Sequence, residues 1–526
     1  MIILNKAGHI IVTKDDIAYR NIKNLLAIPE NEKIYNKEYN ARLKKFKVKA
    51  TLVPTIKYLY TIKNDKLYIP YGLNKYIEYL YQNSEVKYAG VINHPLMDTK
   101  KIINIITDFR NILPGISLYD SQLDCIKEIF IHKRGVIQAG TGFGKSEVIC
   151  ATIKIMQQLN NGKFPTILLF EPTIELLKGM IKRFKKYKIP INDYRQSRMI
   201  FKNKVNLAHP TSIGNDLVNN PNILDKVEVH FVDEAHHSKS LSWYTPTLSM
   251  PNLIYMIGTS ATFLSHYAAD GQNIDDFSYE ELRTIGAIGP ILKKIDGKNL
   301  IQADILAKPK VIVFNNKADE YIDESDYEWQ TIRKVRLHSE DRTRLIAKIA
   351  TFLIKYNRKI IIMMNTLDWG IQIMQYIYEL GYGPYVRTCY GGQKYGKINK
   401  KGKFEKEYLD VLNLFDRDRI NVLVGSSTLQ EGIDLKKVDG VILADVGKSD
   451  RGTLQSLGRC LRLSKTGKFA YVIDFNDEED EILNRHYNER LIKYERVLGI
   501  TNEQDRLLNI NMKEFVKQFK EWENIK

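Results

Sequence analysis

Cysteine is scarce in this sequence, and long apolar runs are absent. Its 526 residues include four cysteines, Cys125, Cys150, Cys389 and Cys460, which lie far apart and form no CxxC or Cys/His cluster. This pattern argues against a disulfide framework or a zinc site and favours a reducing compartment. No apolar run approaches the roughly 20 residues of a membrane-spanning helix, and the N-terminus lacks the layout of a signal peptide. We therefore expect a cytoplasmic protein with no membrane partner.

Positive charge is in excess. The formal net charge is +17 and the isoelectric point is about 9.3, so the chain should attract polyanions, of which nucleic acid is the commonest. The alternative is that the excess is spread over solvated faces. Eleven of the 31 tyrosines fall within residues 1–110, interleaved with lysine. They form either a stacking surface for nucleic acid or the core of a small mixed domain.

Hydrophobic patterning predicts four parts. Residues 1–112 mix strand-like runs with turns and a helical stretch, which indicates a small α+β accessory domain for binding DNA. In residues 113–315, short buried-strand runs alternate with helical segments. The same alternation returns in residues 316–480, which begin with an acidic linker. This alternation is typical of a parallel sheet covered by helices. Residues 481–526 are charged and helical, so we expect a C-terminal helical segment.

A glycine-rich loop lies between an apolar strand, GVIQ, and a helical run, EVICATIKIM. Strand, glycine loop, GK[ST] and helix in this order predict a phosphate-binding loop for ATP, because successive backbone N–H groups and the helix N-terminus attract anions. Lys145 would reach the terminal phosphates, and the hydroxyl of Ser146 would bind Mg²⁺. The predicted nucleotide-binding residues of the loop are Gly140, Thr141, Gly142, Gly144, Lys145 and Ser146.

Two adjacent carboxylates follow a second apolar strand, VEVHF. Asp233 would hold the hydration shell of Mg²⁺, and Glu234 would polarise the attacking water. An isolated pair of this kind is more often an acidic cap on a surface helix. A phosphate loop one lobe-length upstream favours the catalytic interpretation.

With the DEAHH sequence placed after that loop, the chain resembles the superfamily 2 helicases, which implies two tandem RecA-like domains. The resemblance assigns Tyr119 and Gln122 to adenine recognition. It assigns strand contacts to Pro172, Thr173 and Ser212. It also predicts that Ser260 and Thr262 of the SAT segment, with His236 of DEAHH, link the ATP site to the nucleic acid.

The second lobe continues the same order of motifs. The resemblance makes Asn365 and Thr428 nucleic-acid contacts and places Gly432 and Asp434 near the nucleotide. The octapeptide QSLGRCLR matches QxxGRxxR, and its spacings of four and three put the key side chains on one helical face. Arginine suits the stabilisation of charge on the γ-phosphoryl group, so we predict catalytic roles for Gln455, Arg459 and Arg462.

Within this superfamily the closest resemblance is to the phage recombination helicases of the UvsW type and their XPB-like relatives. It rests on DEAHH, on the segment 285–311 and on LYIPYGL at 67–73. It implies an ATP- and Mg²⁺-dependent motor that unwinds or remodels branched DNA in recombination and repair. It would act on single- and double-stranded DNA with little sequence preference, in the host cytoplasm if a phage encodes it. RNA in hybrids, and recombination or replication proteins, are further expected partners.

Three alternatives remain open. The chain could be the motor subunit of a restriction system, although it has no obvious PD…ExK nuclease pattern. It could be an RNA helicase, or a non-catalytic scaffold with a decayed motor. Six lysines in the segment 394–406 predict either a loop that touches DNA or, as the favoured alternative, a flexible solvated loop.

Overall fold

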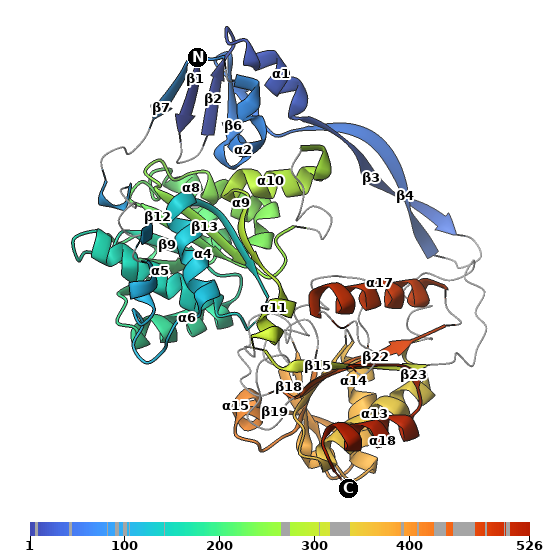
Figure 1. The fold of residues 1–526 in the computed structure, drawn as a ribbon. Coiled ribbons are helices and arrows are strands. Elements are labelled where there is room, and N and C mark those ends of the chain that lie inside the picture. The colour runs from blue at the N-terminus through green and yellow to red at the C-terminus, as the bar shows by residue number, and fades with distance from the viewer. Residues whose placement is uncertain are drawn as a thin grey trace. The chain divides into compact units, whose positions relative to one another are not determined.

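The computed structural model divides into two compact units (Figure 1): residues 1–138 with 146–294, and residues 139–145 with 295–526. It describes the chain except for residues 6–8, 41–44, 82, 90–93, 98–102, 105, 141, 265–273, 304–305, 316–336, 365, 391–393, 408–409, 426–437, 445–468, 479–480, 499, 501–504 and 526. The predicted linker after residue 315 falls outside the described residues up to residue 336. No described helix has both the length and the apolar composition to cross a membrane.

A small mixed sheet begins the first unit, in the order β5-β6-β2-β1-β7. Its strands are β1 (Ile2–Asn5), β2 (His9–Thr13), β5 (Thr61–Lys63), β6 (Lys66–Pro70) and β7 (Val86–Ala89), with helices α1 (Ala18–Leu25) and α2 (Asn74–Ile77). Asn64 and Asp65 both have positive φ, 47° and 57°, at the two-residue turn between β5 and β6. This is the turn that their residue types predict.

A long pair of strands follows α1. β3 (Ala27–Asn40) and β4 (Lys45–Tyr58) pair along their whole lengths, from Ala27 with Tyr58 to Asn40 with Lys45. Within the described residues they form a two-stranded sheet of their own. Among the N-terminal tyrosines, Tyr76 and Tyr81 are buried in the core, while Tyr58, Tyr79 and Tyr88 are exposed. The stacking role stays a prediction.

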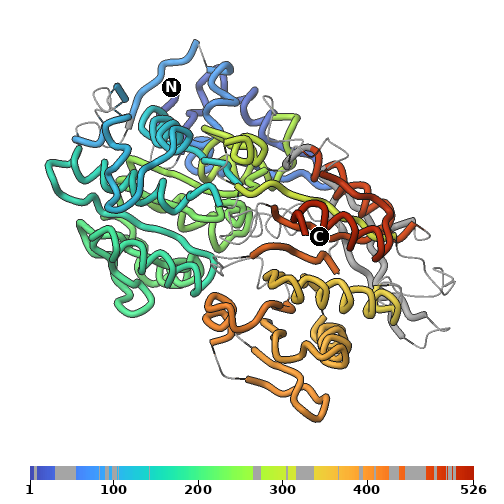
Figure 2. Tube along the Cα trace, turned by 60° about the horizontal axis from the view of Figure 1, so that its bottom comes forward, coloured from blue at the N-terminus to red at the C-terminus, as the bar shows by residue number. Residues whose placement is uncertain are grey.

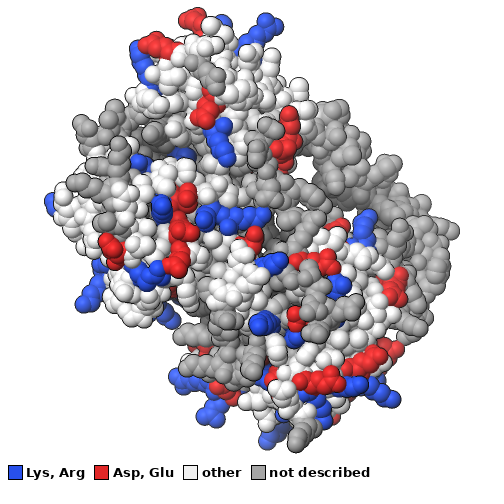
Figure 3. All heavy atoms as spheres, in the orientation of Figure 1, with Lys and Arg blue, Asp and Glu red and all other residues white. Residues whose placement is uncertain are grey.

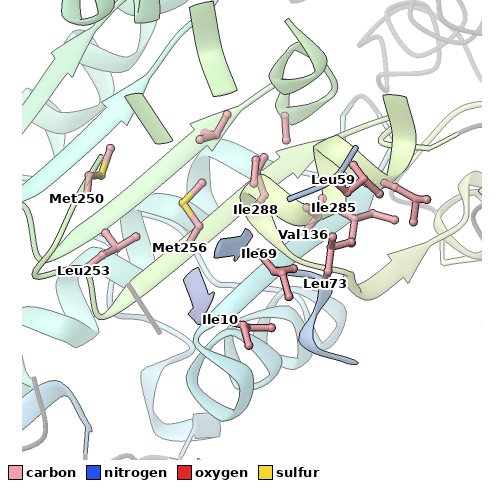
Figure 4. Packing of buried hydrophobic residues seen from close by; sticks show 14 of the residues in the cluster. Ile10, Leu59, Ile69, Leu73, Val136, Met250, Leu253, Met256, Ile285 and Ile288 are labelled. Carbon is pink, nitrogen blue, oxygen red and sulfur yellow. The ribbon is translucent and has the colours of Figure 1, made fainter. Parts of the chain in front are cut away.

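The small sheet and the first parallel sheet share one hydrophobic core (Figure 4). Ile10, Ile69 and Leu73 from the N-terminal part belong to the same buried cluster as Ile285 and Ile288 of helix α10 (Tyr279–Ile288). The N-terminal part and the first lobe are therefore packed together around one core.

The close approach between these parts depends on a glycine. A Cβ atom at Gly72 would lie 2.0 Å from the carbonyl oxygen of Ile285 and 2.7 Å from that of Gly286. Beside this contact, the guanidinium of Arg134 lies 5.5 Å from the ring centre of Tyr71 and donates to the carbonyl of Ala287 at 3.0 Å.

The large sheet of the first unit has the order β10-β11-β9-β12-β13-β8-β14. Its strands are β8 (Arg134–Ala139), β9 (Ile167–Phe170), β10 (Ile191–Asp193), β11 (Val205–Ala208), β12 (Val229–Asp233), β13 (Tyr255–Ser260) and β14 (Ile291–Ile295). The strands from β10 to β8 are parallel. The accompanying helices are α4 (Asp120–His132), α5 (Lys145–Leu159), α6 (Ile174–Lys186), α7 (Tyr194–Ser197), α8 (Pro210–Asn219), α9 (Leu241–Thr247) and α10.

The second unit contains a larger sheet in the order β19-β18-β17-β20-β16-β21-β22-β15-β23. Its strands are β15 (Lys308–Asn315), β16 (Ile360–Met363), β17 (Val386–Tyr390), β18 (Lys394–Ile398), β19 (Phe404–Glu407), β20 (Val422–Gly425), β21 (Gly440–Leu443), β22 (Phe469–Asn476) and β23 (Arg506–Ile510). Its helices are α11 (Gly297–Gln302), α13 (Glu340–Lys355), α14 (Leu367–Glu379), α15 (Val411–Asp416), α17 (Glu481–Leu498) and α18 (Met512–Trp522). Both predicted parallel-sheet lobes are thus confirmed.

Two predicted boundaries differ from the structure. The sequence assigned residues 308–315 to the end of the first lobe, but β15 pairs in parallel with β22 and β23 of the second sheet. The C-terminal segment was predicted to be helical, and it also contributes β23 to that sheet's edge. Strand partners so distant in sequence are chosen by long-range packing, which local patterning does not reveal.

The C-terminal helices belong to the core of the second unit. Phe515 and Phe519 of α18 are fully buried, and their rings lie 5.7 Å from Phe314 and 5.1 Å from Phe352. On α17, Arg490 forms a buried ion pair with Asp474, with a nitrogen–oxygen distance of 2.9 Å. These contacts make the segment after residue 480 an integral part of the lobe.

The Gly72 contact gives a testable expectation. Gly72→Ala should destabilise the first unit by about 1–3 kcal/mol, because backbone atoms on both sides must move to admit the methyl group. Thermal unfolding and limited proteolysis after about residue 110 would measure this loss. The control is Gly179→Ala in α6, whose Cβ would lie 3.7 Å from the side chain of Arg183, and which should gain up to about 1 kcal/mol. Unaltered melting of Gly72→Ala would contradict this packing.

Candidate nucleotide site and its coupling residues

The glycine loop leaves the carboxyl end of β8 and enters α5. Gly142 and Gly144 have φ angles of 91° and 88°, which favour glycine. Phe143 between them is fully buried and anchors the loop. The ammonium group of Lys145 donates to the carbonyl oxygen of Ala139 at 3.0 Å.

The helix that follows begins at the predicted phosphate-binding residues. α5 starts at Lys145, so Ser146 lies in its first turn, where backbone N–H groups lack helical partners and attract anions. Gly140, Lys145 and Ser146 thus stand where the sequence places them, at the junction of loop and helix. Thr141 lies outside the described residues.

The paired carboxylates close β12, which is separated from β8 only by β13. The side chain of Asp233 is fixed, because its Oδ1 accepts hydrogen bonds from the hydroxyl of Thr259 at 2.5 Å and from the backbone N–H of Glu234 at 3.0 Å. Glu234 adopts a left-handed conformation, with φ 47° and ψ 52°. Such a backbone is uncommon outside glycine, costs roughly 1–2 kcal/mol and is typical of functional turns.

The three predicted coupling residues lie in one hydrogen-bonded group. His236 is almost fully buried, and its Nδ1 lies 3.0 Å from the hydroxyl of Ser260 and 3.3 Å from Oε2 of Glu234. The same hydroxyl of Ser260 accepts the backbone N–H of Thr262 at 3.2 Å. A chain of contacts therefore runs from Glu234 to the end of β13.

Glu171 is a residue that the sequence analysis missed. It follows β9, whose last residue, Phe170, is paired with Val232, so Glu171 is level with Asp233 on the neighbouring strand. It is fully buried, and neither carboxyl oxygen has a hydrogen-bond partner within the described part of the chain. Burial, followed by the charges of Asp233 and Glu234, raises the pKa of Glu171 well above its usual range. The sequence signal that could have identified Glu171 is its position as a charged residue directly after the apolar run ILLF.

The predicted adenine segment is held by local contacts. Tyr119 is exposed and precedes α4, whereas Gln122 is buried. The side-chain oxygen of Gln122 accepts the backbone N–H of Tyr119 at 3.0 Å, which fixes the direction of the amide. Arg110 donates to the carbonyl of Leu118 at 2.8 Å and holds the segment from the other side.

The first-lobe residues assigned to strand contacts begin helices at the carboxyl edge of the sheet. Thr173 caps α6 by accepting the N–H of Leu176 at 3.3 Å, and it directly follows Pro172. Ser212 lies in the first turn of α8, where its N–H donates to the carbonyl of His209 at 3.0 Å. Pro172, Thr173 and Ser212 are all partly exposed.

The second-lobe assignments cannot be placed. Outside the described residues lie Asn365, Thr428, Gly432, Asp434, Gln455, Arg459 and Arg462. Their roles stay predictions.

The described residues fit a magnesium nucleotide. The loop and helix N-terminus offer N–H donors to phosphates, while Ser146 and the oriented Asp233 are the oxygen donors that Mg²⁺ prefers. Among the described residues no group of three His, Cys, Asp or Glu side chains is arranged to hold a metal ion. A Mg²⁺ ion bound together with nucleotide phosphates needs only one or two protein oxygens, so the donor set suffices.

Two family models match the chain. The model "Type III restriction enzyme, res subunit" matches residues 115–265, and "Helicase conserved C-terminal domain" matches residues 344–464. The first match contains the glycine loop, the paired carboxylates and the Ser260–Thr262 segment, and the second contains the QSLGRCLR octapeptide. The chain belongs to the superfamily 2 helicases. Its two parallel-sheet lobes are the RecA-like domains of this family of ATP-hydrolysing nucleic-acid motors.

The similar proteins are helicases and a restriction enzyme. "Putative helicase 22" of Sulfolobus islandicus filamentous virus is 23% identical over 390 residues, which are 69% of this chain and 64% of that protein. The DNA-bound type ISP restriction-modification enzyme LlaBIII has a TM-score of 0.51 at 14% identity, over 77% of this chain and 32% of its own. This helicase chain therefore spans less than two thirds of either relative.

T4 UvsW aligns with 96% of this chain and 98% of its own length, at 16% identity. The TM-score is 0.37. The resemblance of this superfamily 2 helicase to the UvsW group therefore rests on the sequence motifs.

Burial of Glu171 predicts a pH dependence. Its folded pKa lies above the unfolded value of about 4.5, so its contribution to stability is complete below that pH and is lost as pH rises toward the folded pKa. Glu171→Gln removes this loss. The free energy of unfolding of the Glu171→Gln variant, minus that of the wild type, should therefore rise from pH 5 to pH 8, by at most about 1.4 kcal/mol per pH unit.

Urea unfolding at several pH values would measure the difference. Glu85→Gln, at a carboxylate whose side chain is 64% exposed, controls for the loss of one charge. A constant difference between Glu171→Gln and the wild type across this range would show that Glu171 ionises normally.

Proposed function

We propose that this protein is an ATP-driven, Mg²⁺-dependent DNA helicase or translocase that unwinds or remodels branched DNA. One observation carries the proposal: the strands that lead into the glycine loop and the paired carboxylates, β8 and β12, are parallel and lie one strand apart. Their carboxyl ends therefore share one edge of the sheet, which is where parallel α/β sheets bind ligands.

The proposed chemistry divides among the residues of the two lobes. Lys145 binds the terminal phosphates, Ser146 and Asp233 hold Mg²⁺, and Glu234 orients and polarises the water. Tyr119 and Gln122 bind the adenine. From the second lobe, Gly432 and Asp434 contact the nucleotide, and Arg459 and Arg462 with Gln455 stabilise the developing charge. Bound nucleotide thereby favours closure of the lobes, and product release favours opening.

The contacts around Glu234 support a route for coupling. Because Glu234 approaches His236, and His236 shares the hydroxyl of Ser260 with Thr262, a shift of Glu234 during hydrolysis alters the end of β13. Pro172, Thr173 and Ser212, with Asn365 and Thr428 of the second lobe, would grip the phosphate backbone. Such contacts read no bases, so little sequence preference is expected.

A restriction motor is the second candidate, because the matching model is named for the res subunit of a type III restriction enzyme and LlaBIII is a restriction-modification enzyme. An RNA helicase is the third. Branched DNA is preferred because of DEAHH, the 285–311 segment and the LYIPYGL resemblance, and recombination or replication proteins would be its partners.

Substitutions at three residues test the motor. Lys145→Ala should abolish ATP hydrolysis, whereas Glu234→Gln should bind ATP normally and lose roughly 10²- to 10⁴-fold in turnover. Arg462→Ala should behave like Glu234→Gln, with a loss of roughly 10³-fold or more. Nucleotide binding by fluorescence and steady-state ATPase assays separate these effects. Normal turnover of Lys145→Ala would refute the phosphate-site assignment.

The choice of substrate gives a separate prediction. ATPase activity should be stimulated by DNA, and unwinding should be fastest on forks, four-way junctions, D-loops or R-loops. Stimulation by RNA alone would favour the RNA-helicase alternative. Translocation on linear duplex without strand separation would favour the restriction motor, and an ATPase silent with every nucleic acid would favour the scaffold.

A further inference from the structure

The lysine-rich segment of the second lobe is an ordered hairpin, although the sequence analysis favoured a flexible loop. β18 pairs with β17 from Thr388–Gly396 to Tyr390–Lys394, and β19 pairs with β18 from Ile398–Phe404 to Tyr395–Glu407. These antiparallel strands extend the parallel sheet at one edge. Figure 2 shows the hairpin in orange at the margin of the second unit.

The tip of the hairpin is held in one conformation. The side-chain oxygen of Asn399 accepts the backbone N–H groups of Lys401 and Lys403 at 3.0 and 3.1 Å. The hydroxyl of Tyr378, on α14, donates to the carbonyl of Lys400 at 2.9 Å. The ring of Phe404 lies so close to Gly396 that a Cβ there would be 2.2 Å from it.

The exposed charges of the hairpin are mostly positive. Its buried carboxylate, Glu407, takes both Arg387 and Lys397 at 2.7 Å. Four further lysines are exposed, and Glu405 is the single exposed acidic side chain among residues 394–407 for which the structure describes burial. The exposed lysines are Lys400, Lys401, Lys403 and Lys406. In Figure 3 basic side chains gather over β18, β19 and α15.

We propose that this hairpin, defined by Lys400, Lys401, Lys403 and Lys406, binds the phosphate backbone of the nucleic acid on which the motor acts. The inference rests on the proposed function. The lysines offer mobile point charges suited to phosphates and carry no base-reading geometry. Because hydrogen bonds from Asn399 and Tyr378 already hold the turn beneath them, binding costs little backbone entropy.

The surface chemistry favours nucleic acid over an acidic protein. Protein interfaces bury a core of apolar and aromatic side chains. Of the large hydrophobic side chains that are exposed in the described part of the chain, none lies between residues 394 and 407. The hairpin therefore presents charge without an apolar core.

The position of the hairpin in the sheet predicts a length dependence. β19 is three strands from β20, after which the predicted contact Thr428 follows. At about 4.8 Å per strand, β19 lies roughly 14 Å to the side of β20. We therefore expect the lysines to hold nucleic acid to one side of β20, and to matter most for substrates long enough to reach them.

The test compares two fourfold Lys→Gln variants. The first changes Lys400, Lys401, Lys403 and Lys406, and the matched control changes Lys348, Lys355, Lys513 and Lys517, which are exposed on α13 and α18 of the same unit. Fluorescence anisotropy on forked DNA with short and long arms, over a range of salt, measures affinity. The hairpin variant should lose about tenfold or more on long arms, with a salt slope reduced by roughly 2–4, and the control should not.

A third variant separates shape from charge. Gly396→Val keeps every lysine but displaces Phe404, so it should weaken binding on long arms with a smaller change in salt slope. Unfolding curves confirm that each variant folds, and ATPase activity without nucleic acid should equal that of the wild type.

Equal loss in the hairpin and control variants would mean that net charge alone acts, and would overturn the proposal. Unchanged binding of the hairpin variant, with ATPase activity that still requires Lys145, would overturn it while leaving the proposed function intact. Failure of the wild type to bind any nucleic acid would instead remove the proposed function.

Discussion

The parallel pairing of β12, β13 and β8 is the constraint on which the rest of this molecule depends. It brings the end of the strand before the glycine loop and the end of the strand before Asp233 to one edge, with the hydroxyl of Thr259 between them fixing the carboxylate at 2.5 Å. The left-handed turn at Glu234 then directs the chain into His236. Strain in that turn persists because β12 holds its start and the contact of buried His236 with Ser260 holds its end.

The carboxyl groups of Glu171, Asp233 and Glu234 lie at this edge, and their surroundings differ. Asp233 accepts two hydrogen bonds, which fix the orientation of its carboxyl group. Glu171 is fully buried beside it, and burial and the neighbouring charges favour its neutral form, which raises its pKa. A neutral Glu171 reduces the repulsion among these three neighbouring carboxyl groups.

Both accessory regions are built into the lobes. The N-terminal sheet shares a core with the first lobe, through contacts such as Gly72 against Ile285. The C-terminal segment inserts Phe515 and Phe519 into the second lobe and pairs Arg490 with Asp474. Each accessory part therefore belongs to the hydrophobic core of its own unit.

Local features could be predicted from the order of the amino acids: the glycine loop and its helix, the strands that end at Asp233 and Ser260, and the alternation that defines two lobes. These follow from short-range patterns, because a turn, a strand and a helix start are encoded within a few residues. Four features could not be predicted in this way: Glu171 lies level with Asp233, His236 bonds to Ser260, β15 joins the second sheet, and the lysine segment is a β-hairpin. These depend on which strands become neighbours, and that is fixed by packing between segments far apart in the chain.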